Sequence, residues 1–430
     1  MCCMEEWKEY KLRDLFLEIK SGDWGKDSPQ YEYVESVACL RGADIPSTNK
    51  QQISKAPTRY ITARNFAAKS LKIGDLVIEI SGGSPTQSTG RVAYISQSVL
   101  NLYKSRVICS NFCKVLQVNT DVIDSNFAYY LWNYLYKKGI FFSYENGTNG
   151  LKNLCLDAFL DYEYVTIPSS LDEQQAIATF LSEIDNKIAV NLRVSSNLEA
   201  QAQAIFKHWF IDFAPFKDGE FIESEIGMIP EGWKVGTLGD VLTSIETGNR
   251  PPGGAASEGV PSIGAEKIEG ICYYDFSSEK YVPKEFFENM RRGKVQSRDV
   301  LLYKDGAYTG KSTLFMNDFP YAECAVNEHV FLLRTDESKW QCWLYLYLSY
   351  EPIRRYIHTL ASAKAAQPGL NQVELKSVKI ILPPADVIDR FEATAHSLLS
   401  PIIHYLKENR NLSMLRDTLL PKLMSGQIKL

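Results

Sequence analysis

A glycine-rich segment in the second half of the chain carries the most suggestive chemistry, Gly306-Ala-Tyr-Thr-Gly310-Lys311-Ser312. Glycines followed by a lysine and a hydroxyl are typical of loops whose backbone N–H groups surround a phosphate. The nucleotide-binding loop needs four residues between its glycines, and this segment has three. The spacing therefore argues against an ATP site, because the backbone could not wrap the phosphates.

A second glycine-rich segment, Gly82 to Arg91, occupies the matching position in the first half of the chain. Both segments end in a basic residue, which suits contact with phosphate or with base edges better than ATP. The alternative is a solvated hairpin. The candidate contact residues are Ser84, Gln87, Arg91, Tyr308 and Lys311.

Two further loops, residues 146–152 and 363–371, precede the final predicted strand of each half. Amide and lysine side chains are the types that read adenine edges and hold phosphates. A glycine-dictated turn with polar decoration is the alternative. The candidate contact residues, including one from a turn after Gly248, are Asn149, Lys152, Arg250, Lys364, Gln367 and Asn371.

Catalytic motifs are weak or missing. Asp318 with Glu337 and Lys339 faintly resembles a nuclease metal site, but adjacent Asp336 and the loop context favour a polar turn. The chain has no Asn/Asp-Pro-Pro-aromatic segment of the adenine methyltransferase type and no glycine-rich turn for S-adenosylmethionine. The nine cysteines form no Cys-x-x-Cys pair and the five histidines are scattered, so neither zinc nor disulfides are indicated. We expect no catalytic residue, bound cofactor or metal.

Composition limits where the chain works. The net charge is −5 and no domain is strongly basic, so any DNA contact must be focused on particular loops or helped by a partner. The N-terminus lacks an apolar signal core, and no later stretch reaches membrane-spanning length. We expect a soluble protein in a reducing cytoplasm.

The elements that position these loops belong to an internal repeat, because the second half of the chain restates the first in the same order. Only loop lengths drift between the copies. The matched pairs are Trp7 and Trp233, Leu12 and Leu238, Ile19 and Ile245, Gly22 and Gly248, Asp75 and Asp299, and Pro168 and Pro383. Such a duplication can imitate a two-fold dimer and suits a partner that also comes in two halves.

Each copy ends in a long helical stretch with a narrow apolar seam at heptad spacing. The first begins with the capping box of Ser170 and Glu173 and ends near Pro215. The acidic residues 220–231 then read as a linker. We expect the two stretches to pack antiparallel along the seam residues Ile177, Leu181, Ile184, Ile188, Asn191, Ser195, Leu198, Ala202, Ile205 and Trp209, and Phe391, Ala395, Leu398, Ile402, Tyr405, Asn409, Leu412, Leu419 and Leu423.

Two asparagines, a proline and an arginine interrupt these seams. Asn191 and Asn409 either form a buried register-fixing pair or lie at a frayed, wet edge. Pro401 either kinks the second helix or, with Ser400 as cap, restarts it. Arg416 also stands on the seam.

The globular parts read as mixed α/β domains. Apolar runs at 75–80, 107–118 and 299–303 predict strands, and aromatic stretches at 126–138 and 340–350 predict helices. The sequence therefore predicts domains at 1–168 and 216–385, a central helix at 169–215 and a C-terminal helix at 386–430.

The junction between the copies, SEIGMIPEGWKVGTLGDV at 224–241, resembles the opening of the second target-recognition domain in specificity subunits of type I restriction-modification systems. The resemblance covers essentially the whole chain. Copy two departs from it, since Asp389-Arg390 stands where a Glu-Gln pair is expected. Its other marks are Ile167-Pro168, Glu173-Gln174, the helix end at 207–213 and the C-terminal segment 419–428.

The resemblance implies a non-catalytic DNA-reading subunit with two target-recognition domains in a pseudo-two-fold arrangement, separated by two antiparallel coiled-coil helices. Each domain would read one half of a bipartite double-stranded DNA target. Two methyltransferase subunits would dock on the helices, and restriction subunits would join them. Those partners would use S-adenosylmethionine, ATP and Mg²⁺. The competing interpretations are a stand-alone DNA-modifying enzyme and a coiled-coil scaffold.

Overall fold

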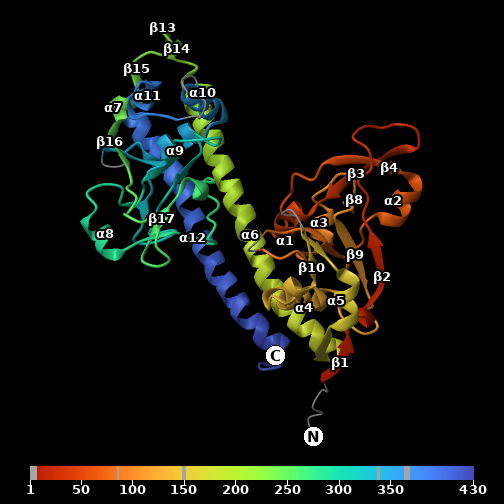
Figure 1. Cartoon of the computed structure of the whole chain (residues 1–430). Helices are drawn as coiled ribbons and strands as arrows, with labels where there is room; N and C mark the ends of the chain where they lie inside the picture. Colours follow the sequence, from red (N-terminus) through yellow and green to blue (C-terminus); the bar gives the residue numbers. More distant parts are fainter. Residues whose placement is uncertain (1–6, 85–86, 148–151, 337–338, 363–368) are drawn as a thin grey trace. The chain divides into compact units, whose positions relative to one another are not determined.

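The computed structural model describes residues 7–84, 87–147, 152–336, 339–362 and 369–430 (Figure 1). The chain divides into two compact units. Unit 1 comprises Met1–Ala189 and Asn411–Leu430, and unit 2 comprises Val190–Arg410. The boundary between them passes through the two longest helices, α6 (Leu171–Phe210) and α12 (Ala385–Met424).

Unit 1 is built on small sheets. A four-stranded antiparallel sheet has the order β2 (Phe16–Ser21), β9 (Cys113–Val118), β5 (Leu76–Glu79), β7 (Val92–Tyr94). A three-stranded sheet has the order β4 (Thr58–Thr62), β3 (Tyr33–Leu40), β8 (Arg106–Cys109), with β3 and β8 parallel. β1 (Trp7–Lys11) pairs with β12 (Tyr164–Pro168), and β10 (Glu145–Asn146) and β6 (Ser81–Gly82) flank β11 (Lys152–Leu154). The helices are α1 (Ile45–Asn49), α2 (Ala63–Lys69), α3 (Gln97–Leu100), α4 (Ser125–Lys137) and α5 (Leu156–Tyr162).

Unit 2 repeats three of these four sheets. Its four-stranded sheet has the order β16 (Leu242–Thr247), β22 (Val330–Thr335), β19 (Val300–Tyr303), β20 (Ser312–Leu314). Its three-stranded sheet has the order β18 (Tyr281–Val282), β17 (Val260–Ile263), β21 (Ala325–Val326), again with one parallel pair. β15 (Lys234–Thr237) pairs with β23 (Lys379–Leu382), and β13 (Phe221–Ser224) with β14 (Gly227–Pro230). The helices are α7 (Leu238–Val241), α8 (Lys284–Asn289), α9 (Gln341–Ser349), α10 (Glu351–Ser362) and α11 (Gln372–Lys376).

The two units agree in local detail. The first strand of each four-stranded sheet has an irregular register one residue after it begins, between Phe16 and Glu18 and between Leu242 and Ser244. The repeated glycine that follows this strand is also explained. A Cβ on Gly22 would lie 2.0 Å from the carbonyl oxygen of Ser110, and one on Gly248 would lie 1.5 Å from that of Val326. Only glycine allows this close backbone approach.

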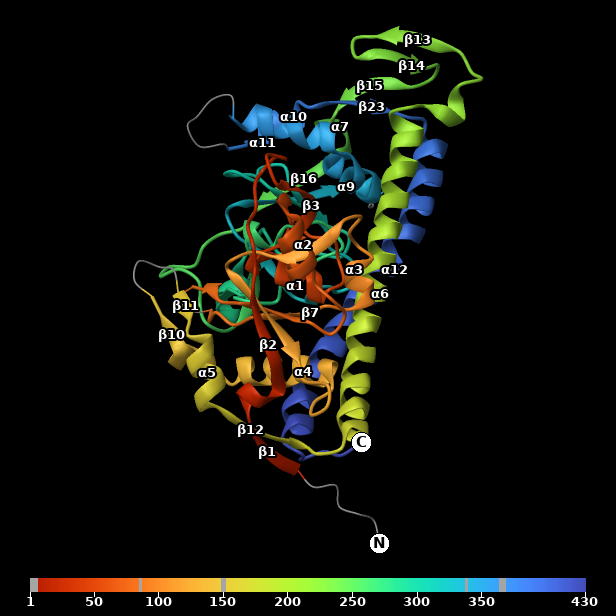
Figure 2. The same ribbon diagram turned by 90° about the vertical axis from the view of Figure 1, so that its right-hand side faces the viewer.

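The central strands and one aromatic helix form the core of each unit. β5 and β19 are short runs buried on both faces, which is why they read as continuous apolar stretches instead of alternating ones. Beneath them lie α4 in unit 1 and α9 in unit 2, whose buried side chains include Trp132 and Trp343. α9 is buried along nearly its whole length, so its apolar residues surround the helix. Figure 2 shows α9 against the long helices of its unit.

Within unit 2, α6 and α12 run in opposite directions. Asn191 lies opposite Asn409 at one end and Phe210 lies against Phe391 at the other, with ring centroids 4.7 Å apart. The Nδ2 of Asn191 donates to the Oδ1 of Asn409 at 2.8 Å and to Glu408 at 2.8 Å. Asn191 is 1% exposed, so of the two alternatives for this residue the structure has the buried pair.

Within unit 1, the same two helices are joined by a charged pair. Arg416 Nη1 lies 2.6 Å from Asp185 Oδ1, and the hydroxyl of Tyr130 on α4 donates to the other oxygen of Asp185 at 2.7 Å. Burial alone would lower the pKa of Arg416, but Asp185 and Asp417 raise it. Arg416, which interrupts the predicted seam, therefore joins the two long helices, and its partner Asp185 ties them to α4 of the globular part.

One buried polar side chain near the start of each long helix holds that helix to its unit. In unit 1, Gln174 is fully buried; its Oε1 accepts from the N–H of Asp124 at 2.8 Å, and its Nε2 donates to the carbonyl of Pro168 at 2.8 Å. In unit 2, Glu392 accepts from the N–H of Trp343 at 2.7 Å and from Arg298 at 2.9 Å. Copy two lacks the Glu-Gln pair, and there Glu392 holds the helix to its unit as Gln174 does in copy one.

Several predicted elements hold and others are wrong. α4, α9, β5 and β19 lie where expected, Ser170 Oγ accepts from the N–H of Glu173 at 3.3 Å as a cap, and every predicted seam residue is buried or half-buried. The run 107–118 is two strands, because a turn at Ser110 sends β8 and β9 into different sheets. The expected linker contains the β13–β14 hairpin, and α12 continues through Pro401 without restarting. α6 ends at Phe210, before Pro215.

The Glu392 anchor should make the stability of unit 2 depend on pH. Burial raises the pKa of Glu392 to about 7, against the opposing effect of its hydrogen bonds and Arg298. The folded chain then holds this proton more tightly than the unfolded chain, so stability present below about pH 4.5 is lost as pH rises through about 7. The loss is on the order of 3 kcal/mol. We expect Glu392→Gln to remove most of this dependence of the unfolding free energy on pH, because glutamine does not titrate.

The measurement is urea unfolding at mildly acidic and mildly basic pH, followed by hydrogen exchange in α9 so that unit 2 is observed separately. Gln174→Glu is the matched control, because it should introduce a similar slope into unit 1. If the unfolding free energy of Glu392→Gln depended on pH as strongly as that of the parent chain, Glu392 would not be the source of the pH dependence.

Candidate nucleic-acid interface

The candidate loops of each unit leave the same edge of its four-stranded sheet. In unit 2, β16 and β19 end where β20 and β22 begin, since Thr247 is paired with Phe331, and Tyr303 with Val330. Loops 248–259, 304–311 and 327–329 therefore emerge together, and we call them the loop edge of unit 2. The pairing of Ser21 with Lys114 and of Glu79 with Cys113 defines the loop edge of unit 1, formed by loops 22–32 and 110–112 and by the described residues of the segment 80–91, which includes β6.

Arg91 at the loop edge of unit 1 forms a two-pronged ion pair with Glu79. Its Nε lies 2.8 Å and its Nη2 2.6 Å from the two carboxylate oxygens. The Glu79 hydrogen bond is the main cause that raises the pKa of Arg91, and Glu79 is only 3% exposed. The guanidinium is therefore held in place and has little freedom to swing outward.

Lys152 reaches the same edge from β11. Its Nζ lies 2.9 Å from Glu145, which also accepts from the hydroxyls of Ser88 and Thr89 at 2.9 and 2.8 Å. Burial would raise the pKa of Glu145, but Lys152 and these hydrogen bonds outweigh it and lower it. Nearby, Gln87 is exposed on a turn in which its N–H bonds to Ser84 Oγ at 3.0 Å. Asn149 lies outside the described residues.

The loop edge of unit 2 carries a different set of side chains. Arg250 Nη2 lies 2.6 Å from Glu328, and Lys311 Nζ lies 2.7 Å from Glu269 and over the ring of the exposed Tyr308. Asp305 contacts Lys304 at 2.6 Å and His329 Nδ1 at 3.1 Å.

Asn371 has a structural role that the sequence did not assign. Its side chain accepts from the N–H of Glu374 at 2.9 Å and so caps α11. Lys364 and Gln367 lie outside the described residues, as does Glu337 of the metal-site pattern.

The glycine-rich segment of unit 2 is a hairpin between β19 and β20. The N–H groups of Thr309, Gly310 and Lys311 donate to the carbonyls of Gly306, Tyr303 and Tyr308. These donors are thus used within the loop, and the backbone cannot cradle a nucleotide phosphate. Within the described ranges, no group of three or more His, Cys, Asp or Glu side chains is arranged to hold a metal ion. No helix in the described parts is long and apolar enough to cross a membrane.

Each predicted cation that the structure describes is paired with a carboxylate at its own loop edge. Sequence reasoning missed these partners, Glu79, Glu145, Glu269 and Glu328, because each is separated from its cation along the chain and meets it only in the folded unit. A loop edge with balanced charge offers donors and acceptors side by side. Such an arrangement suits the reading of base edges, which present both, better than the neutralisation of phosphates.

The family follows from a match along both units. The family model described as "Type I restriction modification DNA specificity domain" matches residues 4–200 and 230–392. The chain belongs to this family. Its function is that of a specificity subunit of a type I restriction-modification system.

Relatives along the full length agree with the family. The chain is 26% identical over 434 residues to the type I restriction enzyme MjaIX specificity subunit of Methanocaldococcus jannaschii, covering 99% of this chain and 94% of the relative. It is 21% identical over 488 residues to the HindI specificity subunit of Haemophilus influenzae, covering 99% and 100%. Among solved structures, the S subunit of the type I system from M. genitalium has a TM-score of 0.54 at 16% identity, covering 98% and 96%, and so shares the fold.

The pairing at the loop edges predicts different outcomes for two matched basic residues. Arg91→Ala leaves the buried Glu79 unpaired and should cost about 3 kcal/mol of stability. Lys311→Ala leaves Glu269 to be solvated by water, because that side chain is already about half exposed, and should lower stability by under about 1 kcal/mol. Lys311→Ala should instead weaken DNA binding and, if Lys311 reads a base, relax specificity at one position by about 1–3 kcal/mol.

Thermal unfolding and methylation mapping measure the two effects, with Arg91→Lys as the control that keeps the charge beside Glu79. An Arg91→Ala variant of unchanged stability would contradict the prediction for Arg91. A Lys311→Ala variant with unchanged affinity and specificity would contradict the prediction for Lys311.

Proposed function

We propose that unit 1 and unit 2 each read one half of a bipartite double-stranded DNA target through their loop edges. The observation that carries this proposal is one strand topology built twice with different side chains at the same edge. Arg91, Glu79 and Lys152 line one edge, and Lys311, Tyr308 and Arg250 line the other. A common scaffold with different edge chemistry is what two different half-sites require.

We further propose that α6 and α12 form an antiparallel coiled coil that relates the two domains by a pseudo-two-fold axis. The domains would correspond to residues 1–168 and 216–385, with the spacer at 169–215 and 386–430. Two methyltransferase subunits would dock on these helices, and restriction subunits would join them. This chain would supply no catalytic group, and the partners would bind S-adenosylmethionine, ATP and Mg²⁺. A cytoplasmic location follows from access to DNA.

A domain exchange tests the assignment of one domain to one half-site. Residues 1–168 are replaced by the first domain of another family member, and the chain is expressed with its methyltransferase partner. We expect one half of the methylated sequence to change and the other half to stay, as read by methylome sequencing. The chain without its partner is the control and should transfer no methyl group. A change in both halves, or in neither, rules out the assignment.

A second test asks whether the two long helices set the distance between the half-sites. Four residues added to an α-helix lengthen it by about 6 Å, which corresponds to about two base pairs of DNA. Four residues also add slightly more than one full turn, so the apolar seam nearly keeps its face. Insertions are made in both helices at the boundaries of the two units along the chain, between Ala189 and Val190 and between Arg410 and Asn411.

We expect both half-site sequences to persist while the gap between them widens by about two base pairs. Insertion into α6 alone is the matched control and should disturb the pairing of the helices. Methylation mapping that finds an unchanged gap, in a variant that stays folded and bound to its partner, would mean that other elements set the distance.

A further inference from the structure

Two adjacent arginines beside the loop edge of unit 2 differ from the cations described so far. Arg291 and Arg292 are both exposed, and they follow α8. Arg292 donates to the side-chain oxygen of Asn249 at 3.2 Å, and Arg291 has no ion pair within the part of the chain that the structure describes. Together they border a hollow that is also lined by Asn249, Phe286, Asn289 and Met290.

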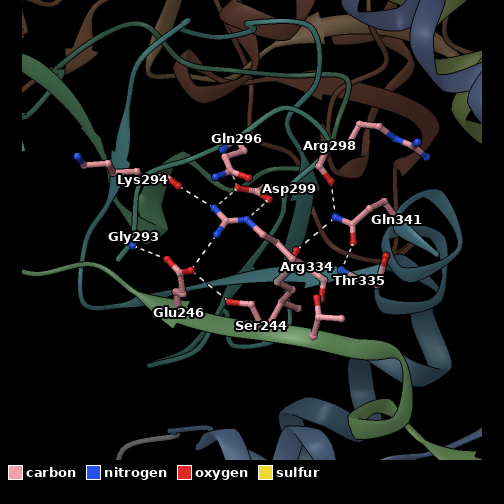
Figure 3. Close-up of polar contacts among 12 residues, drawn as sticks. Ser244, Glu246, Gly293, Lys294, Gln296, Arg298, Asp299, Arg334, Thr335 and Gln341 are labelled. Carbon is pink, nitrogen blue, oxygen red and sulfur yellow. Dashed lines mark hydrogen bonds and ion pairs between the residues drawn. The ribbon is translucent and has the colours of Figure 1, made fainter. Parts of the chain in front are cut away.

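A partly buried charge network fixes the segment that follows these arginines. Arg334 on β22 bonds to both oxygens of Asp299 at 2.8 Å and to Glu246 at 2.8 Å (Figure 3). Asp299 is 2% exposed. Glu246 and Arg334 lie on two strands of one sheet, and Asp299 immediately precedes β19 of the same sheet, so their positions are set by the strand register.

The network holds three backbone groups of residues 293–296. Glu246 accepts from the N–H of Gly293 at 2.6 Å, Arg334 donates to the carbonyl of Lys294 at 2.8 Å, and Asp299 accepts from the N–H of Gln296 at 2.7 Å. Charge-assisted bonds of this kind are about twice as strong as neutral ones. The backbone beside the arginine pair is therefore held rigidly.

Gly293 allows the backbone of residues 293–296 to pack directly against the loop edge. Its φ is +80°, and a Cβ there would lie 2.7 Å from the Cα of Gly248, the repeat glycine that opens loop 248–259. Unit 1 has no equivalent pair in the described residues, because α2 ends in Ala67-Ala68-Lys69 and the Lys69 ammonium donates to the carbonyl of Gly22 at 2.9 Å.

We propose that Arg291 and Arg292 are a phosphate-contact site of unit 2, positioned by the network of Arg334, Asp299 and Glu246 so that the DNA backbone is gripped beside the bases that the loop edge reads. This inference rests on the proposed function. Phosphate contacts supply most of the sequence-independent affinity for DNA, and cations already paired with carboxylates contribute little to it. The arginine pair is the exposed, positioned charge that the loop edge itself lacks.

The test measures binding of the full chain to a short duplex of unrelated sequence by fluorescence anisotropy, between about 50 and 200 mM salt. Each phosphate contact contributes about 0.9 to the slope of log affinity against log salt. Arg291→Ala/Arg292→Ala should weaken binding and lower the slope by about 1.8. Arg291→Lys/Arg292→Lys should keep the slope, because a point charge suffices for phosphate.

Lys217→Ala/Lys234→Ala is the matched control. It removes the same charge from exposed positions of unit 2, one of them on β15, which lies at the opposite end of the unit from α8 (Figure 1). Its slope should stay at the parent value. A double alanine variant that retains the parent slope, or falls only as far as this control, overturns the proposal. A parent chain that binds no DNA at any salt contradicts the proposed function instead.

Glu246→Gln tests the positioning role of the network. Removing a negative charge near DNA should by simple electrostatics strengthen binding, whereas loss of the charged bond to the Gly293 N–H should loosen the arginine pair and weaken it. Weaker binding supports the proposal, and stronger binding overturns the positioning role. Circular dichroism and thermal unfolding establish that the variant is folded, and the surface arginine variants decide the phosphate contact independently.

Discussion

The burial of one polar side chain at the start of each long helix is the constraint on which each unit depends. Gln174 and Glu392 each accept backbone N–H groups at the start of an aromatic helix, α4 or α9. That helix lies beneath the four-stranded sheet whose far edge carries the loops. Because an unpaired buried polar group costs about 1–3 kcal/mol, these bonds fix helix, sheet and loop edge as one body within each unit.

Under the proposed function, two kinds of surface divide the work of DNA recognition. The loop edges carry ion pairs that are already formed, such as Arg91 with Glu79 and Lys311 with Glu269, and offer a fixed pattern of donors and acceptors. Arg291 and Arg292 carry charge that is not used up internally. A chain of net charge −5 needs this separation, because a general basic surface is not available to it.

The sequence predicted what depends on local patterns. The matched pairs such as Gly22 and Gly248 identified the duplication, and heptad spacing placed α6 and α12, because both signals lie in contiguous residues. The split of 107–118 into two strands was missed, since one apolar run can serve two sheets. The partners of the candidate cations were also missed. Glu79, at the end of β5, meets Arg91, which precedes β7, only through the pairing of those strands, and the network of Arg334, Asp299 and Glu246 joins β22 and β16 to the residue before β19.

The preformed ion pairs at the loop edges change the thermodynamic character of recognition. When a free lysine or arginine meets DNA, condensed counterions are released and the entropy gain drives association. Where the cation already holds a carboxylate, as Lys311 holds Glu269, contact with a base is an exchange of one bonded partner for another, with few ions released. Binding to a half-site would then be driven chiefly by enthalpy. The salt dependence of binding would instead reflect the contacts with DNA phosphates and the partner subunits.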